Sequence, residues 1–434
     1  MLEDFKNHID NHFPKLLQNK FLLACSGGLD SVVLAHLCSH YELDFSLAHC
    51  NFKLRGKESD KDEKFVRELA KKMGKYIFVK DFETLDYARD QKVSVQMAAR
   101  DLRYEWFNAL MLQNNIKTLV TAHHSDDNLE TFMINLSRGT GIKGLTGIPS
   151  RTRNIVRPLL PFTRKQILKF ANSSKLAWRE DLSNAETKYL RNKIRHDIVP
   201  LLKELHPTFM TNFTETQEFL KQISEIADNH ISQLKKDIFK EDGEVIRIKI
   251  ESLRALEPLE AYLHALFSAY GFTEWEDLQH LLTAMSGKEV RSRTHRLVKD
   301  RDYLLLTNIE DNLQKEFQIT KEDTEIQTPI GLSISSVHII EEVGPNVLYL
   351  DKETLKYPLT LRKWQKGDYF YPLGMKGRKK LSKYFKDEKV DVIAKEKQWL
   401  LCSGNDIIWV VGKRADDRYK ITNSTNKILK IALN

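Results

Sequence analysis

The 434-residue sequence contains few cysteines, and their arrangement suggests neither a metal site nor a disulfide framework. The four residues, Cys25, Cys38, Cys50 and Cys402, form no Cys-x-x-Cys pair. This pattern argues against a disulfide-rich secreted scaffold, a zinc ribbon and a cysteine-held iron–sulfur cluster. Free cysteines suit a reducing compartment, so we expect a cytoplasmic protein.

Long apolar runs are also missing, since none approaches the roughly 20 residues that a membrane-spanning helix needs. Residues 1–6 are charged and lack the apolar core of a signal peptide. The sequence shows no internal repeat and no low-complexity tract. A length of 434 residues with 41% hydrophobic content predicts a globular chain of two to four domains without a membrane partner.

Positive charge is present in excess and is concentrated in one segment. The net charge is +8, and residues 362–389 contain ten Lys or Arg against three Asp or Glu, which gives that segment +7. Six aromatic residues are interleaved with these cations: Trp364, Tyr369, Phe370, Tyr371, Tyr384 and Phe385. Cations with aromatics suit phosphate contact and base stacking in a nucleic-acid partner, although a solvated charged surface is the alternative.

The most informative stretch joins an apolar segment, residues 21–25, to a glycine turn. The turn and the residues after it read Ser26, Gly27, Gly28, Leu29, Asp30 and Ser31. This order predicts a buried strand, a tight turn and a helix start, where backbone N–H groups form a seat for phosphate. The alternative is that Asp30 and Ser31 only cap the helix.

Strands and helices alternate through the first half of the chain. We expect further strands over residues 44–50, 76–79 and 118–122, and helices over residues 58–73 and 95–112. This alternation predicts an α/β domain with a parallel, doubly wound sheet. Ligands bind such sheets beyond the carboxyl ends of the strands. Ser26, His49 and His123 are each expected just past a strand end, so they should converge on one crevice.

Acidic residues cluster at the predicted start of another helix. Asp126, Asp127 and Glu130 follow closely after His123 and His124. One or two such carboxylates, together with phosphate oxygens, can hold Mg²⁺ on a nucleotide. Capping and compensation of the helix dipole are the alternative. The two histidines lack a third nitrogen or sulfur ligand nearby, so a phosphate, ribose or packing role is favoured over metal binding.

Arginines recur on predicted helix faces and loops near these motifs. Arg100 and Arg103 are three residues apart, and Arg191 and Arg195 are four apart, so each pair shares a helix face. Arg138 lies near the start of a glycine-rich segment, residues 136–149, which interleaves apolar residues too regularly for a spacer. We expect that segment to form an ordered loop at the mouth of the site.

The hexapeptide at residues 26–31 resembles the SGGxDS loop of the N-type ATP pyrophosphatases, the PP-loop superfamily. Further motifs follow in one order: AHCNFKLRG at 48–56, AARDLRY at 98–104, AHHSDDNLET at 122–131, the loop at 136–149, RPLL at 157–160, EDLSN at 180–184 and RNKIRH at 191–196. This ordered set resembles the tRNA(Ile)-lysidine synthetase family. Residues 364–381 resemble the C-terminal domain of the same family, so the likeness reaches both ends of the chain.

The resemblance implies an ATP-dependent ligase that joins L-lysine to C2 of the wobble cytidine in tRNA(Ile) with a CAU anticodon. AMP is transferred to the C2 oxygen first, and the lysine ε-amine then displaces it, which gives lysidine, AMP and pyrophosphate. ATP, Mg²⁺, L-lysine and this tRNA are therefore the implied cofactors and partners.

Site residues follow by position. The implied nucleotide contacts are Ser26, Gly27, Gly28, Leu29, Asp30, Ser31, His49, Arg100 and His123. The implied catalytic residues are Asp30, Asp126, Asp127 and Glu130, of which Asp30 and Asp126 are expected to hold Mg²⁺. The implied contacts to lysine or tRNA are Asp127, Glu130, Arg138, Asn184, Arg191, Arg195, Lys376, Arg378, Lys379 and Lys380.

The second half of the chain predicts smaller domains. Residues 1–206 form the expected catalytic domain, and the spacing of apolar residues over 207–240 predicts a long linker helix. Residues 241–312 are expected to form a small α+β domain, and residues 325–434 a β-rich, basic domain that binds tRNA.

Two rival functions remain open at this stage. One is a PP-loop tRNA thiolase, which would need sulfur-carrying cysteines that this chain does not pair. The other is a non-catalytic RNA-binding protein built around the basic segment. A homodimer is an open alternative to a monomer.

Overall fold

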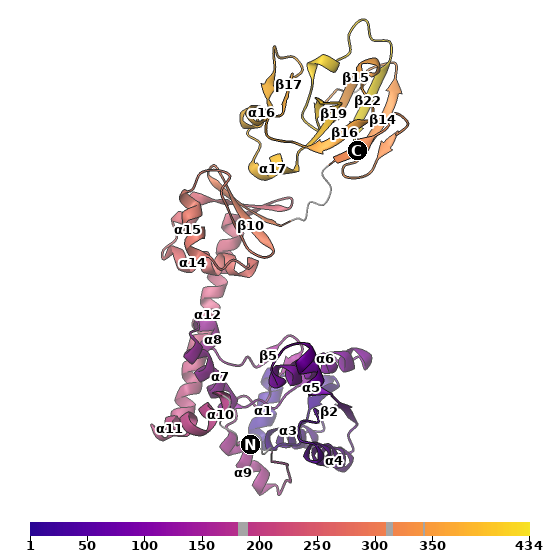
Figure 1. Ribbon diagram of the computed structural model, residues 1–434. Coiled ribbons are helices and arrows are strands. Elements are labelled where there is room, and N and C mark those ends of the chain that lie inside the picture. The colour runs from indigo at the N-terminus through magenta and orange to yellow at the C-terminus, as the bar shows by residue number, and fades with distance from the viewer. Residues whose placement is uncertain (181–189, 310–315, 342) are drawn as a thin grey trace. The chain divides into compact units, whose positions relative to one another are not determined.

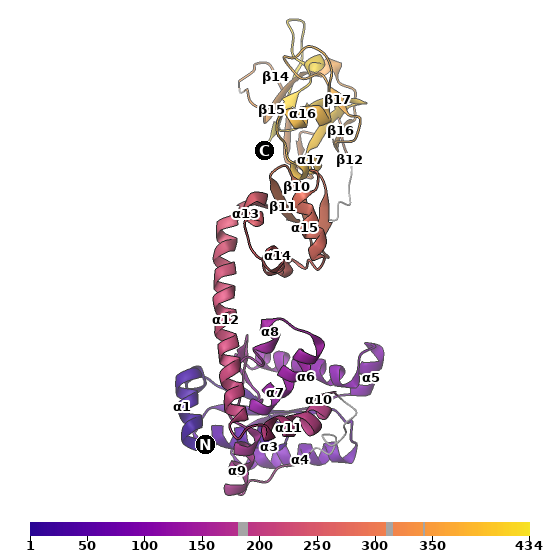
Figure 2. The same cartoon turned by 90° about the vertical axis from the view of Figure 1, so that its left-hand side faces the viewer.

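The computed structural model describes residues 1–180, 190–309, 316–341 and 343–434. The chain divides into two compact units, Met1–Asp228 and Asn229–Asn434. The division falls inside one continuous helix, α12 (Phe209–Ile238), which Figure 2 shows unbroken. The long helix predicted from residue 207 onward is therefore confirmed within two residues at each end.

The first unit is built on a six-stranded sheet in the order β3-β2-β1-β4-β6-β5. Its strands are β1 (Phe21–Ala24), β2 (Phe45–Asn51), β3 (Ile77–Asp81), β4 (Leu119–Val120), β5 (Arg151–Thr152) and β6 (Ile155–Val156). The first four and β6 run parallel, and β5 is an antiparallel edge strand hairpinned to β6. The parallel sheet is confirmed, and the sequence reading missed the β5–β6 hairpin.

Helices cover both faces of this sheet, because alternate residues of β1 pack into different cores. Phe21 and Leu23 pack with Val33 and Leu37 of α3 (Leu29–His40). Leu22 packs on the other face, with residues of α6 (Val95–Gln113). Figure 1 shows this unit with its labelled helices around the strands.

The remaining elements of the first unit are short connections and covering helices. They are α1 (Leu2–His12), α2 (Lys15–Gln18), α4 (Lys57–Lys72), α5 (Thr84–Asp90), α7 (Ser125–Arg138), α8 (Ile142–Leu145), α9 (Arg164–Ser173), α10 (Leu190–Lys193), the π-helical segment η2 (Ile194–Ile198) and α11 (Val199–Glu204). The glycine-rich segment at residues 136–149 includes the end of α7 and the helix α8, and its expected place at the mouth of the site stays a prediction.

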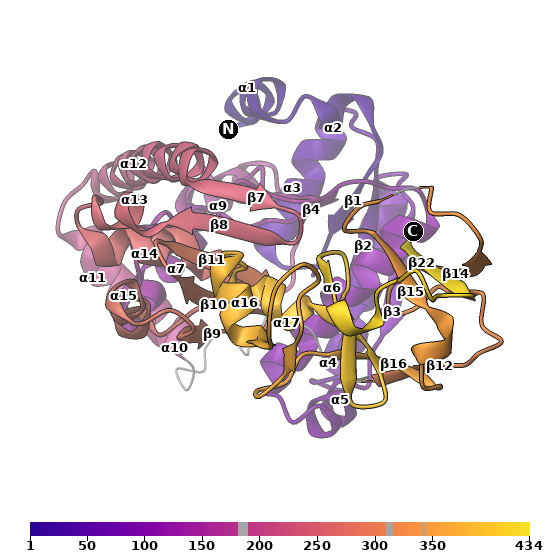
Figure 3. The same cartoon turned by 90° about the horizontal axis from the view of Figure 1, so that it is seen from above.

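The second unit begins with a five-stranded antiparallel sheet in the order β7-β8-β11-β10-β9. Its strands are β7 (Phe239–Asp242), β8 (Val245–Lys249), β9 (Glu289–Arg291), β10 (His295–Asp300) and β11 (Tyr303–Asn308), of which β7, β8 and β11 are visible side by side in Figure 3. Leucines of this sheet share a core with α13 (Ile250–Arg254), α14 (Leu259–Phe267) and α15 (Trp275–Thr283). A hairpin at residues 296–307 is observed as the β10–β11 pairing.

Two further sheets of the second unit pack on a shared core. One has the order β12-β16-β19-β20-β21 and the other β13-β14-β22-β15. Residues of both, such as Leu361, Trp409, Leu348 and Ile431, belong to one buried cluster. The strands are β12 (Glu316–Ile319), β13 (Glu325–Ile326), β14 (Leu332–Val337), β15 (Val347–Asp351), β16 (Leu359–Lys363), β19 (Trp399–Ser403), β20 (Asp406–Val410), β21 (Arg414–Ala415) and β22 (Ile428–Leu433).

The basic segment forms a small hairpin and helix beside these sheets. It contains β17 (Tyr369–Phe370), β18 (Lys379–Lys380) and α16 (Leu381–Asp387), and α17 (Val392–Lys397) follows. Phe370, Tyr384 and Phe385 are buried in one cluster, so these three aromatics are not available for the base stacking that the composition of the segment suggested. They alternate with lysines because the hairpin and the amphipathic helix turn aromatics inward and cations outward.

Across the residues described, no helix is long and apolar enough to cross a membrane. The division of the second unit into a middle and a C-terminal domain stays a prediction.

Candidate active site

A pocket of about 730 Å³ opens at the carboxyl ends of β1 and β4. The chain leaves β1 toward β2 on one side, and β4 lies on the other, so the sheet order reverses here. Such a switch point is where open α/β sheets bind ligands. Ser26 and Asp30 after β1, and Thr121 and His123 after β4, line the pocket. The expected convergence of Ser26 and His123 is therefore seen.

The glycine turn holds a specific backbone shape between β1 and α3. Gly27 has φ +88°, and a Cβ atom there would lie 3.1 Å from Val66 Cγ2, so the turn favours glycine at this position. Ser31 Oγ donates to the Gly28 carbonyl at 3.0 Å, and the amide of Arg179 donates to the Gly27 carbonyl at 2.9 Å. These bonds fix the turn while the start of α3, a helix of 12 residues beginning at Leu29, faces the pocket.

Asp30 lies in the first turn of α3 but does not cap it. Gly28 is the N-cap residue and receives no side-chain cap, so the capping alternative fails for Asp30. Its Oδ2 lies 3.2 Å from Arg164 Nη1 and 3.6 Å from His124 Nε2, whereas its buried Oδ1 has no hydrogen-bond partner among the described residues. Asp30 therefore presents an unused acceptor beside the glycine turn.

His124 sits among three carboxylates. Its ring nitrogens lie 3.6 Å from Asp30 Oδ2, 3.8 Å from Asp126 Oδ2 and 3.5 Å from Asp127 Oδ2. Burial alone would lower the pKa of His124, but the contact with Asp30 and the charges of the other carboxylates raise it above its ordinary value. The carboxylates around His124 therefore favour the protonated form of its ring.

Asp126 is turned away from the pocket. One of its oxygens accepts from the backbone N–H of Arg164 at 2.8 Å, and the other pairs with Lys203 Nζ. Its side chain is 7% exposed, and Asp126 is not among the residues that line the pocket. Both oxygens are used in joining α7 to α9 and α11, so the arrangement does not fit the expected role of Asp126 as a metal ligand.

Asp127 and Glu130 are held by the two arginines that share a helix face. Glu130 accepts from Arg191 Nε at 2.8 Å and from Arg195 Nε and Nη2 at 2.5 and 3.0 Å. Asp127 Oδ1 lies 3.2 Å from each guanidinium, and its Oδ2 accepts from the His124 amide at 3.1 Å in a capping box. Asp127 thus both caps α7, as its alternative predicted, and faces the pocket with Arg191 and Arg195.

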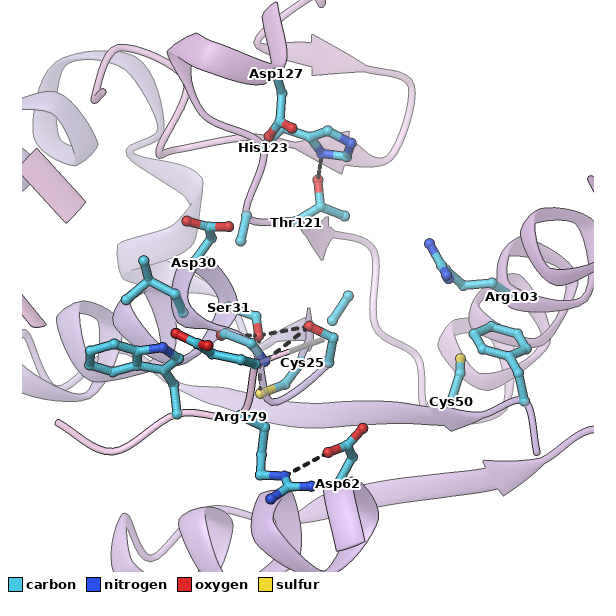
Figure 4. Close-up of a pocket in the computed structure, with 18 of the residues that line it drawn as sticks. Cys25, Asp30, Ser31, Cys50, Asp62, Arg103, Thr121, His123, Asp127 and Arg179 are labelled. Atoms are coloured by element: carbon cyan, nitrogen blue, oxygen red, sulfur yellow. Dashed lines mark hydrogen bonds and ion pairs between the residues drawn. The ribbon is translucent and has the colours of Figure 1, made fainter. Parts of the chain in front are cut away.

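The other side of the pocket is partly apolar. Figure 4 shows Arg103 and Cys50 across the pocket from Asp30 and Asp127. Arg103 stacks on Phe52, with its guanidinium carbon 5.1 Å from the ring centroid. A flat guanidinium supported by an aromatic ring suits a flat, polar ring such as a nucleobase.

Arg179 ties the glycine turn to α4. Besides the bond from its amide to Gly27, its side chain donates to Asp62 at 2.8 Å and to Glu58 at 2.7 Å. Figure 4 shows the Arg179–Asp62 ion pair at the pocket wall. The sequence reading missed Arg179 and Arg164, because neither stands in a local pattern that places it beside residues more than a hundred positions away.

Several predicted site residues lie outside this pocket. His49 lies inside β2 because the pairing with β3 continues to Asn51, so its placement past the strand end was wrong. It is 3% exposed and its Nδ1 is 2.9 Å from the Cys25 carbonyl. Arg100 stacks on Tyr104 and does not line the pocket, whereas Arg103 does. Arg138 ends α7 as an exposed residue, and Asn184 lies outside the described residues.

The fit of a metal ion rests on one carboxylate. Among the described residues no group of three or more His, Cys, Asp or Glu side chains is arranged to hold a metal ion. Mg²⁺ on a nucleotide needs fewer protein ligands, since phosphate oxygens and water complete its shell. The unpartnered Oδ1 of Asp30 fits such an ion.

Three stretches of the chain match protein-family models. Residues 1–202 match a PP-loop domain, residues 241–309 match the TilS substrate binding domain, and residues 359–431 match the TilS substrate C-terminal domain. The chain is 41% identical to the tRNA(Ile)-lysidine synthase of Parabacteroides distasonis, over 99% of each chain. It is 37% identical to the protein of that name in Bacteroides thetaiotaomicron, over 97% of each chain.

Matches among solved structures show lower identity. A U34-tRNA thiolase from Methanococcus maripaludis is 19% identical, with a TM-score of 0.42, over 50% of this chain and 79% of that chain. A TilS C-terminal domain is 18% identical, with a TM-score of 0.24, over 27% of this chain and 95% of that chain.

Proposed function

The chain belongs to the tRNA(Ile)-lysidine synthase family, and we propose that it joins L-lysine to C2 of the wobble cytidine of tRNA(Ile) with a CAU anticodon. ATP is consumed, and lysidine, AMP and pyrophosphate are formed. The observation that carries this proposal is that the glycine turn at Ser26–Ser31 and the carboxylate of Asp127 face one pocket. A backbone turn suited to phosphate and a carboxylate suited to an ammonium group therefore line the same pocket.

The first step moves AMP from ATP to the C2 oxygen of the cytidine. Backbone N–H groups of residues 26–31 and the guanidinium of Arg164 are placed to hold the phosphates as charge develops on the pyrophosphate. Asp30 would hold Mg²⁺ through Oδ1. Mg²⁺ supplies charge neutralisation on the phosphates.

The second step joins lysine to the activated carbon. The lysine ε-amine attacks C2, the bond between C2 and oxygen breaks, and AMP leaves with that oxygen. Asp127, which lines the pocket, and Glu130, which is buried beside it, supply the carboxylates for the ammonium groups of lysine. Asp127 is placed to accept the proton that the attacking amine gives up.

The cysteines argue against the thiolase alternative. Cys50 lines the pocket, but burial raises its pKa to about 12, and burial also raises the pKa of Cys25. Sulfur transfer needs a thiolate, and burial disfavours the thiolate form of both residues.

The tRNA contacts are proposed to involve both units. Exposed cations of the second unit, Lys376, Arg378 and Lys380, are suited to phosphate contact. Arg138, exposed at the end of α7, is suited to the same contact in the first unit.

The test is mass spectrometry of nucleosides from tRNA(Ile) incubated with the protein, ATP and L-lysine. We expect cytidine at the wobble position to be converted to lysidine, with AMP released in equal amount. Omission of lysine is the matched control and should yield no lysidine. Formation of a thiolated nucleoside, or of no modified nucleoside by a protein with an active ATP site, would contradict the proposal.

A further inference from the structure

The carboxylates proposed to bind lysine are already neutralised by two arginines. The two oxygens of Glu130 accept three N–H donors, and Asp127 Oδ1 faces both guanidinium groups. Two negative charges therefore meet two positive charges. A lysine ammonium brought to this cluster would meet like charge and few free acceptor positions.

The same two arginines line the pocket that contains the glycine turn. Arg191 and Arg195 line it together with Ser26, Gly28 and Asp30, whereas Glu130 is 2% exposed and lies behind them. A guanidinium binds phosphate in the same two-pronged geometry that it uses for a carboxylate. Phosphates bound at the glycine turn would therefore compete with Asp127 and Glu130 for these side chains.

The backbone around Arg195 provides a second, independent observation. Arg195 lies in the π-helical segment Ile194–Ile198, between α10 and α11. Such segments are rare and occur mainly as single turns at functional sites. A shift of one residue in helical register re-aims a side chain by about 100°. The segment thus offers a local route by which Arg195 can leave the carboxylates.

We propose that Arg191 and Arg195 block the lysine site by occupying its carboxylates until ATP binds. ATP therefore binds before lysine. The phosphates of ATP attract the arginines away from Asp127 and Glu130, and the freed carboxylates then accept the ammonium groups. The inference rests on the proposed function, which places lysine at these carboxylates. Because linkage is reciprocal, bound lysine tightens nucleotide binding by the same factor.

The experiment measures lysine binding to the full chain without tRNA. Equilibrium dialysis with radiolabelled L-lysine is carried out with and without Mg²⁺ and α,β-methylene ATP, which is not cleaved between the α- and β-phosphates. We expect the analogue to tighten lysine binding by about 5- to 150-fold, the usual range of coupling between sites.

Two variants test whether Arg191 and Arg195 block the lysine site. Arg191→Gln removes the more exposed guanidinium, and Arg195→Lys keeps a positive charge on buried Glu130 while removing the two-pronged contact. Both should bind lysine without the analogue more tightly than the original chain does, which reduces the dependence on nucleotide. Circular dichroism confirms that each variant is folded.

Arg164→Gln is the matched control, since Arg164 also lines the pocket but pairs with Asp30. It should weaken nucleotide binding yet preserve the increase in lysine affinity at saturating analogue. Equal lysine affinity with and without the analogue in the original chain would contradict the proposal that the arginines block the site. It would not contradict lysine binding at Asp127 and Glu130. An unchanged ratio in both folded arginine variants would also contradict the proposal that the arginines block the site. Absence of lysine binding under every condition would instead contradict the proposed function.

Discussion

Single side chains in the pocket are distinguished by which of their atoms remain without partners. Asp30 keeps an unpartnered oxygen among the described residues, whereas both oxygens of Asp126 are bound by neighbouring elements. The two aspartates looked equivalent in the sequence, because both occur at the start of a helix after a strand. Asp30 is therefore suited to a role at the phosphates, whereas Asp126 is suited to joining helices.

The first prediction concerns Asp30. Asp30→Asn should lower the rate of AMP transfer by roughly 10²-fold or more, because a charge that stabilises the transition state is removed. AMP formation from radiolabelled ATP in the presence of tRNA measures it. Lys61→Gln, a change at an exposed ion pair on α4, is the control and should keep the original rate. A folded Asp30→Asn protein with near-original AMP formation would show that Asp30 has no role in the reaction.

The second prediction separates lysine use from ATP use. Asp127→Asn and Glu130→Gln should each raise the KM for lysine about tenfold or more, since hydrogen bonds to charged groups contribute roughly 1.5–3 kcal/mol. AMP transfer to tRNA without lysine should change less. Steady-state kinetics with lysine varied, beside single-turnover AMP transfer, measures the two effects. Equal losses in both assays would assign these carboxylates to the nucleotide.

The third prediction concerns pH and His123. Burial lowers the pKa of His123 to about 4, from an ordinary value of 6.5. Between these values the unfolded chain binds a proton that the folded chain does not, so the free energy of unfolding falls as pH falls. His123→Asn should reduce this loss by at most about 1.4 kcal/mol for each pH unit in the window. Urea unfolding at several values from pH 7 to pH 4 measures the free energy of unfolding of both proteins. Identical pH dependence in the two would contradict the lowered pKa of His123.

At the scale of elements, a polar contact joins three segments of the first unit. Asn128 of α7 donates to Gln217 of α12 at 2.5 Å and accepts from the amide of Ile148, in the glycine-rich segment, at 2.6 Å. Asn128 directly follows Asp127, so this contact braces the helix that carries the acidic residues. The segment is therefore ordered by partners from two helices.

The fourth prediction tests this brace at Gly147. This residue has φ +77°, and a Cβ atom would lie 2.1 Å from Asn128 Oδ1. Gly147→Ala should lower the free energy of unfolding by about 1–3 kcal/mol, the usual cost of a strained backbone conformation. Gly141→Ala is the matched control, because no described atom lies within 4 Å of a Cβ atom there. Urea unfolding of both variants measures the difference, and equal stability would show that the loop adapts freely.

At the scale of the whole molecule, positive charge in the second unit is concentrated in one segment. Residues 362–389 carry a net charge of +7 and lie wholly in the second unit, whose other residues are net negative. Lys376, Arg378 and Lys380 are exposed, whereas Lys379 pairs with Asp387 at 2.8 Å and is 17% exposed. The structure thus distinguishes cations available to a polyanion from one already paired.

The fifth prediction concerns these exposed cations. Replacing Lys376, Arg378 and Lys380 with alanine should weaken tRNA binding and flatten its dependence on log salt by about 0.7 to 0.9 for each phosphate that the protein no longer neutralises. ATP binding should stay unchanged, because these residues do not line the pocket. Filter binding at several salt concentrations measures the slope. Lys379→Ala alone is the control, with a smaller expected change. An unaltered slope in the triple variant would show that the segment is a solvated surface that does not bind tRNA.

The local features could be predicted from the sequence: the parallel sheet, the glycine turn, the long helix and the position of the basic segment. These follow from apolar periodicity, glycine placement and composition, which act between residues close in the chain. Other features became visible only in the folded chain: Arg191 and Arg195 contact Glu130, His49 is buried in β2, and Phe370 belongs to the core. Such partners are set by packing between elements as far apart as Asp30 and Arg164, which no local pattern encodes. The backbone of the site was therefore readable from the sequence, whereas the pairing of its charges was not.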